Sequence, residues 1–233
     1  MIFLGMDVQD IMREFSEDYL LLNRYDATRR SKMVGWFERK KDIKVDLYQW
    51  RSPHGNVWHV MYWRNETGRC EIAQFMVIES TIGKFVLKPQ MTCDGFIILF
   101  YLPHFMKRYR QRMKLGGKMT TMQVIRRYIR NNASGTTNSY PGKVRMYFEV
   151  TTKEGVGLGT WINLRARLMK TFITYGMTYG EQRVRIEESK QQHTNKAENL
   201  IYYDDEINKE MKMFGLSEED YLKALKDKRT YQE

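Results

Sequence analysis

The sequence predicts an α+β fold, in which antiparallel sheets combine with an N-terminal helix pair, central basic helices and C-terminal helices. Three patterns support this class. Near the N-terminus, apolar residues recur every three or four positions from Val8 to Leu22, which is helical spacing. From residue 43 the apolar period changes to two, which is typical of half-buried strands. Helical spacing then returns after residue 195.

The first ninety-five residues are expected to form a helix pair followed by a β-meander. The helices are predicted over residues 7–25 and 29–41. Strands are predicted over 45–50, 57–63, 70–79 and 84–87, because aromatic and β-branched residues alternate there between turn sequences.

The middle of the chain is expected to combine helices and strands. The apolar run 96–101 indicates a buried strand or the start of a helix. Pro103 suits the first turn of a helix that ends near Gly116 and Gly117. A second helix is predicted over 122–131, capped by Thr120 or Thr121. They are followed by a polar loop over 132–143 and by strands over 144–151, 156–162 and 168–175.

The predicted domain organisation has three parts: residues 1–95, a basic helix-helix-sheet region at 96–180, and a helical segment at 181–233. In the last part, helices are expected over 195–214 and 217–226. Of the 233 residues, 42% are hydrophobic and 29% charged, which is typical of a globular protein. No signal peptide or run of 18 apolar residues is found, so a cytoplasmic protein without a membrane segment is expected.

The net charge of +11 is concentrated in one segment. Residues 101–180 contain 15 Lys and Arg residues but only two acids, Glu149 and Glu154. The segments before and after it have net charges of +1 and −3. Because the basic segment has almost no acids of its own, its counter-charge is expected to be external, and nucleic acid is the simplest polyanion.

One helix in this segment carries the candidate site. If it continues from Pro103, His104, Arg108 and Arg112 lie at i, i+4 and i+8 and share one face. An imidazole that titrates near neutrality and two permanently charged guanidiniums suit contact with phosphate. Further nucleic-acid-binding candidates are six other cations of this region: Lys107, Arg110, Arg126, Arg127, Arg130 and Lys170.

Three consecutive features of this region resemble small ribonuclease toxins of the RelE/BrnT/barnase–colicin group. They are the His-x-x-x-Arg-x-x-x-Arg helix, the helix after it, and the strand Lys170-Thr171-Phe172-Ile173-Thr174. The resemblance covers roughly residues 100–176. It implies a helical segment on a four-stranded antiparallel sheet, RNA cleavage without metal or cofactor, a bacterial or phage origin and an antitoxin-like partner protein. His104 would act as base or acid, Arg108 and Arg112 would bind the phosphate, and Thr171 or Thr174 would contribute a hydroxyl.

Cleavage of RNA without metal needs a base, cations for the charge on phosphorus and an acid for the leaving oxygen. The basic segment contains only one histidine, so the acid would be Tyr109, Tyr175 or water. Two other hypotheses use the same segment: a non-catalytic nucleic-acid-binding protein, with RNA favoured over DNA, and a protein whose basic segment meets an acidic partner protein.

Other motifs are assigned structural roles. The closely spaced glycines from Gly155 to Gly159 are expected in a hairpin, because no strand-to-helix context surrounds them. His54 and His59 have no further ligand at metal-binding spacing nearby, so no metal site is predicted there. Most tryptophans are expected in the core.

Overall fold

The computed structural model describes residues 1–3, 5–39, 45–65, 68–92, 95–133, 135–141 and 146–178, with residues 180, 183–185 and 187. The chain forms two compact units, residues 1–178 and 179–233, and the elements described below belong to the first. The helices predicted over 195–214 and 217–226 lie outside the described residues. The domain boundaries predicted at 95 and 180 stay predictions.

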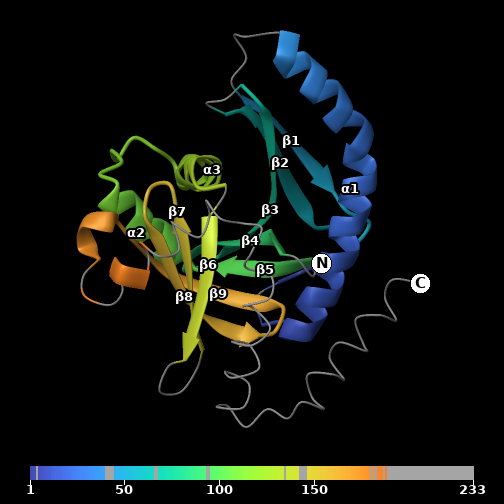
Figure 1. The fold of residues 1–233 in the computed structure, drawn as a ribbon. Coiled ribbons are helices and arrows are strands. Elements are labelled where there is room, and N and C mark those ends of the chain that lie inside the picture. Colours follow the sequence, from blue (N-terminus) through green and yellow to red (C-terminus); the bar gives the residue numbers. More distant parts are fainter. Residues whose placement is uncertain are drawn as a thin grey trace, which may run out of the picture. The chain divides into compact units, whose positions relative to one another are not determined.

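A single nine-stranded sheet organises the first unit, with the strand order β1-β2-β3-β4-β5-β9-β8-β7-β6 (Figure 1). The strands are β1 (Val45–Arg51), β2 (Val57–Arg64), β3 (Cys70–Ser80), β4 (Gly83–Thr92), β5 (Gly95–Tyr101), β6 (Gly135–Pro141), β7 (Met146–Thr152), β8 (Val156–Asn163) and β9 (Ala166–Ile173). The α+β class is confirmed, but the expected separate sheets are one sheet.

The two halves of the sheet join where β5 pairs with β9, the one parallel pair among the described strands. After β5 the chain passes through two helices and three strands before it returns beside β5. A parallel pair requires such a long crossover. The meander and the basic segment therefore share one sheet.

The N-terminal helix pair was predicted wrongly, since α1 (Val8–Arg39) is one helix of 32 residues. The apolar pattern is interrupted near Asp26, but no glycine or proline breaks the helix there. Asp26 is fully buried and accepts hydrogen bonds from the hydroxyls of Tyr62, at 2.5 Å, and Tyr48. A polar residue on the inner face was thus mistaken for a helix end.

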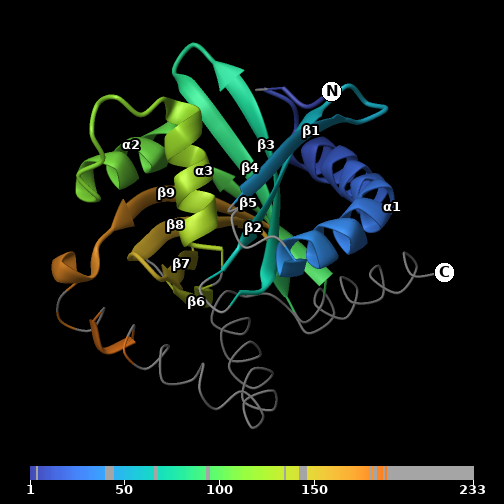
Figure 2. The same cartoon turned by 90° about the horizontal axis from the view of Figure 1, so that it is seen from above.

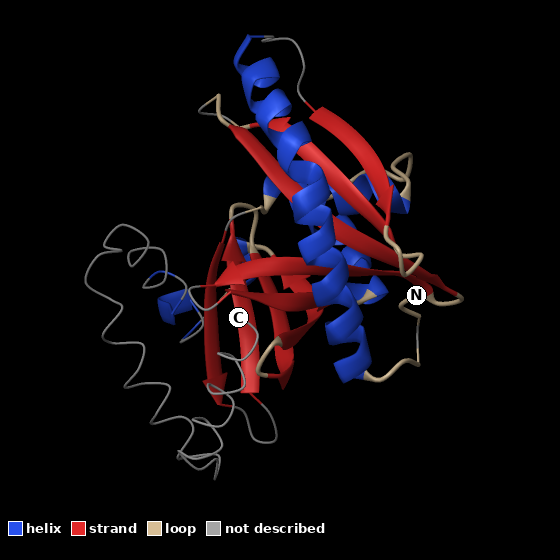
Figure 3. Cartoon of the chain, turned by 90° about the vertical axis from the view of Figure 1, so that its right-hand side faces the viewer, coloured by secondary structure: helices blue, strands red, loops and turns tan. Residues whose placement is uncertain are grey.

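Helices cover both faces of the sheet (Figures 2 and 3). Trp58 and Tyr62 of β2 pack in the cluster that contains Phe15 of α1. Met61 of the same strand packs in the cluster that contains Phe105 of α2 (Pro103–Arg112) and residues of α3 (Thr121–Asn131). This alternation follows from the period of two in a strand. Among the described residues, no helix is long and apolar enough to span a bilayer.

The two central helices were predicted correctly in place, and local chemistry sets their ends. Thr120 caps α3 through a capping box with Gln123. α2 ends at Arg112, before the predicted Gly116, because Lys114 takes a left-handed conformation with φ 51°. A Cβ on Gly157 of β8 would lie 3.3 Å from the Phe105 ring, so glycine there lets α2 pack closely on the sheet.

The segment 132–143 was predicted as a loop, yet residues 135–141 form β6 at an edge of the sheet. Its Thr, Asn and Ser residues gave no apolar alternation. β6 pairs along its whole length with β7, and Ser139 accepts a hydrogen bond from the Trp161 indole at 3.0 Å. Tertiary pairing therefore overrides the polar composition.

Candidate nucleic-acid interface

The predicted basic helix presents one charged face and one buried face. His104, Lys107 and Arg108 are exposed, whereas Phe105 and Tyr109 are completely buried. The buried residues hold α2 against β9 and α3 in the core. The exposed residues consequently project from a helix that is fixed to the sheet.

The predicted pair His104 and Arg108 is in contact. The Nε–H group of Arg108 donates to Nε2 of His104 at 3.1 Å. Nη1 of Arg108 also donates to Oε1 of Gln111 at 3.3 Å. Nε2 of His104 is therefore the acceptor in this contact.

Arg112 links the helix to the strand beside it. Nη1 of Arg112 donates to the Thr171 hydroxyl of β9 at 3.3 Å and also to the carbonyl of Phe172. Arg108 and Arg112 are four residues apart on α2 and share one face. Burial lowers the pKa of Arg112, and the positive charge of Arg108 lowers it further. His104, Arg108, Arg112 and Thr171 therefore form a continuous row of side chains.

Lys170 and Thr174 differ in their relation to this row. Lys170 is exposed on β9, immediately before Thr171. Thr174 is half-buried and precedes the short helix η1 (Tyr175–Met177), where its carbonyl accepts from the Met177 amide. No contact in the described residues joins the Thr174 side chain to α2. The row thus includes Thr171 but not Thr174.

The two tyrosines considered as acids are engaged elsewhere. The Tyr109 hydroxyl donates to Glu154 at 2.5 Å, and the Tyr175 hydroxyl donates to the carbonyl of Thr152. Tyr109 is completely buried. Neither hydroxyl contacts the row of His104, Arg108, Arg112 and Thr171.

Glu154, one of the two acids of the basic segment, is the centre of a polar network. Its carboxylate accepts from Tyr109 of α2, Arg127 and Asn131 of α3, and the neighbouring Asn132, at 2.5, 3.0, 2.8 and 2.9 Å. Burial by itself raises the pKa of Glu154, but the hydrogen bonds from Tyr109 and the two asparagines outweigh it and lower the pKa. The network fixes both helices to the turn between β7 and β8.

The three arginines of the predicted α3 cluster have different environments. Arg127 pairs with Glu154, and exposed Arg130 donates to Asn131 at 3.3 Å. Arg126 is half-buried, and its charge lowers the pKa of His59 on β2. Arg110 of α2 is also half-buried, and its Nε and Nη2 atoms have no hydrogen-bond partner in the described residues.

The charge of the α2 face is not compensated by carboxylates within the described residues. Glu149 is fully buried, and the Glu154 side chain is 12% exposed and already paired. None of the ion pairs in this part of the chain involves Lys107, Arg108 or Lys170.

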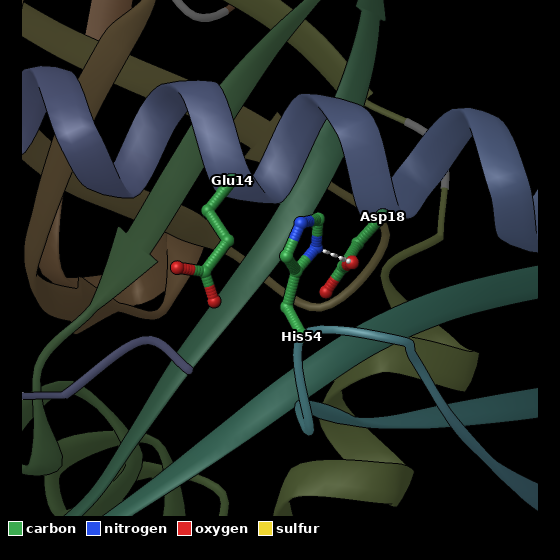
Figure 4. Close-up of side chains that lie close together, drawn as sticks. All are labelled: Glu14, Asp18 and His54. Atoms are coloured by element: carbon green, nitrogen blue, oxygen red, sulfur yellow. Dashed lines mark hydrogen bonds and ion pairs between the residues drawn. The ribbon is translucent and has the colours of Figure 1, made fainter.

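A second polar group lies on the other side of the sheet and was not predicted. Glu14 and Asp18 of α1 meet His54 of the β1–β2 turn, and one ligand atom of each lies within 4.8 Å of the others. Figure 4 shows the imidazole between the two carboxylates. Sequence spacing did not reveal this group, because the acids precede His54 by 40 and 36 residues.

Comparison with protein-family models, curated proteins and solved structures found no match for this chain. The resemblance to ribonuclease toxins therefore stays a prediction.

Proposed function

We propose that the protein binds nucleic acid through the α2–β9 surface, which consists of His104, Lys107, Arg108, Arg112, Lys170 and Thr171. The observation that carries the proposal is a charge imbalance. Lys107 and Arg108 are exposed on α2 and Lys170 is exposed on β9, and none of the three forms an ion pair with a carboxylate among the described residues. Such a surface attracts phosphates and releases their counterions.

The arrangement suits a phosphate backbone better than an isolated anion. Arg108 is exposed beside His104, while Lys107 and Lys170 supply charge from two different elements. Guanidinium groups bind phosphate with two parallel hydrogen bonds, and lysine adds a point charge. A chain of phosphates can contact several of these groups in turn.

The test is binding of a fluorescent single-stranded RNA, followed by anisotropy. The variant Lys107→Ala/Lys170→Ala removes two charges from the α2–β9 surface. The matched control, Arg24→Ala/Lys32→Ala, removes two exposed charges from α1. We expect the first variant to bind about tenfold more weakly and the control to change less than about twofold. Equal losses in both variants would reject the surface, and single-stranded DNA of the same sequence measures the preference for RNA.

RNA cleavage is the second candidate function, and one contact favours it. Nε2 of His104 is the acceptor for Arg108, and it can act as a base once the Arg108 guanidinium turns from it to the phosphate. In this reaction His104 takes the proton of a ribose 2′-hydroxyl. The 2′-oxygen attacks phosphorus, the bond to the 5′-oxygen breaks, and water protonates that oxygen. The products are a 2′,3′-cyclic phosphate and a 5′-hydroxyl.

Incubation with RNA in EDTA separates cleavage from binding. If the protein is a ribonuclease, His104→Ala should lower the cleavage rate by about 100-fold or more, while RNA affinity changes little. Equal rates for the variant and the wild type would exclude His104 as the base. That result would leave the binding proposal intact, since it depends on Lys107 and Lys170.

A further inference from the structure

The group formed by Glu14, Asp18 and His54 has the composition of a metal site. Glu14 and Asp18 are four residues apart on α1, so both carboxylates lie on one helical face. Nδ1 of His54 lies 2.6 Å from Oδ1 of Asp18. An imidazole nitrogen with two carboxylate oxygens is a donor set for first-row divalent metal ions.

Neighbouring side chains hold these carboxylates in place. The amide of Asn56 donates to Oε1 of Glu14 and to Oδ2 of Asp18, both at 2.7 Å. The Trp58 indole lies 3.4 Å from the same Asp18 oxygen. Hydrogen bonds of this kind orient ligands in established metal sites. Oδ1 of Asp18 is left facing His54.

The group also brings three carboxylates close to one imidazole. Asp18 is completely buried, and the Glu14 side chain is only 14% exposed. Within the described residues, no lysine or arginine forms an ion pair with either carboxylate. The N-terminal ammonium of Met1 forms an ion pair with Oε1 of Glu14 at 2.9 Å. Glu17 adds a third carboxylate, 3.4 Å from Nε2 of His54. Glu14 thus has one cationic partner among the described residues, whereas Asp18 is held by neutral donors, Asn56 and Trp58, and by His54. A divalent ion would add positive charge between these carboxylates.

We propose that Glu14, Asp18 and His54 bind one divalent transition-metal ion, with Zn²⁺ as the probe. The ion replaces the proton between Nδ1 of His54 and Oδ1 of Asp18, and that proton is released to solvent. The His54 side chain is 37% exposed, so solvent and ions can reach it. Three protein ligands leave a coordination position open. This site lies on α1 and is independent of the α2–β9 surface.

The experiment is calorimetric titration of Zn²⁺ into the full chain carrying Cys70→Ser and Cys93→Ser, which removes thiol ligands. Two ligand variants, His54→Gln and Glu14→Gln, keep size and polarity while removing a metal donor. Glu79→Gln, which removes an exposed carboxylate from β3, is the matched control. Circular dichroism confirms that each variant is folded.

We expect one Zn²⁺ per chain, with affinity lowered at least about tenfold in both ligand variants and unchanged in the control. Mg²⁺ should bind more weakly than Zn²⁺, because it prefers oxygen ligands and keeps its water. The proposal fails if the parent protein binds no Zn²⁺. It also fails if folded His54→Gln binds Zn²⁺ as tightly as the parent, since the group is then only a hydrogen-bonded pair.

Discussion

Nη1 of Arg112 on α2 lies 3.3 Å from the Thr171 hydroxyl on β9, and it also donates to the backbone carbonyl of Phe172. The guanidinium therefore ties the last turn of the helix to the strand. It also lies close enough to Arg108 for that charge to lower its pKa, in addition to the effect of burial. Arg112 thus both shapes the α2–β9 surface and contributes charge to it.

Arg112→Met should destabilise the protein by about 1–2 kcal/mol, because it removes the hydrogen bonds to β9 while keeping the length of the side chain. Urea unfolding followed by fluorescence measures this change. The exposed neighbour Lys107→Met is the control and should change stability by less than about 0.5 kcal/mol. A loss no larger than in the control would show that Arg112 does not hold α2 to β9.

Glu154→Gln should cost about 2–4 kcal/mol of stability, because an amide group would face side-chain donors now satisfied by a carboxylate. The control is Glu79→Gln, which removes the exposed ion pair with Lys84 and should cost less than about 1 kcal/mol. Chemical denaturation of both variants at neutral pH gives the comparison. Similar losses would mean that the Glu154 network adds little to stability.

The lowered pKa of Glu154 predicts acid sensitivity. Its folded-state pKa lies below the ordinary value, so the unfolded state binds the proton more readily. The stabilisation is complete above the unfolded-state pKa, near 4.5, and is lost as the pH falls through the folded-state pKa. Unfolding free energy measured from pH 6 to pH 3 should fall less steeply in Glu154→Gln than in the wild type. Parallel curves would contradict this assignment.

His59 should give a second pH dependence in a different range. Burial lowers its pKa to about 4, and the charges of Arg126 and Lys84 add to the effect. Unfolding therefore takes up one proton between about pH 6.5 and pH 4, and stability should fall by up to about 1.4 kcal/mol per pH unit in that window. His59→Phe keeps a ring against Phe75 and should remove this slope. Nuclear magnetic resonance titration of His59 checks the pKa directly, and a value near 6.5 would refute the prediction.

The sequence predicted most strands and both central helices because their patterns are local. Alternation located the meander, and Thr120 marked the start of α3. The errors occurred where a residue's role depends on distant partners. Asp26 interrupts the apolar pattern of α1, yet Tyr48 and Tyr62 satisfy it from the sheet. The polar strand β6 is recognisable only once β7 is beside it.

The same limit applies to the candidate sites. Helical spacing correctly placed His104 beside Arg108, since both are on one helix. It could not show that Tyr109 and Arg127 point to Glu154, which comes from a turn between two later strands. The meeting of His54 with Glu14 and Asp18 likewise depends on how α1 packs on the sheet. Contacts between elements require the topology, which the sequence pattern alone did not provide.

The measurement that tests the central claim most directly is the salt dependence of RNA binding by the wild type, Lys107→Ala/Lys170→Ala and the α1 control Arg24→Ala/Lys32→Ala. If the α2–β9 surface contacts phosphates, the slope of log Kobs against log salt should decrease in magnitude by about two in the first variant and stay unchanged in the control. An unchanged slope in Lys107→Ala/Lys170→Ala, or an equal decrease in the control, would contradict the account.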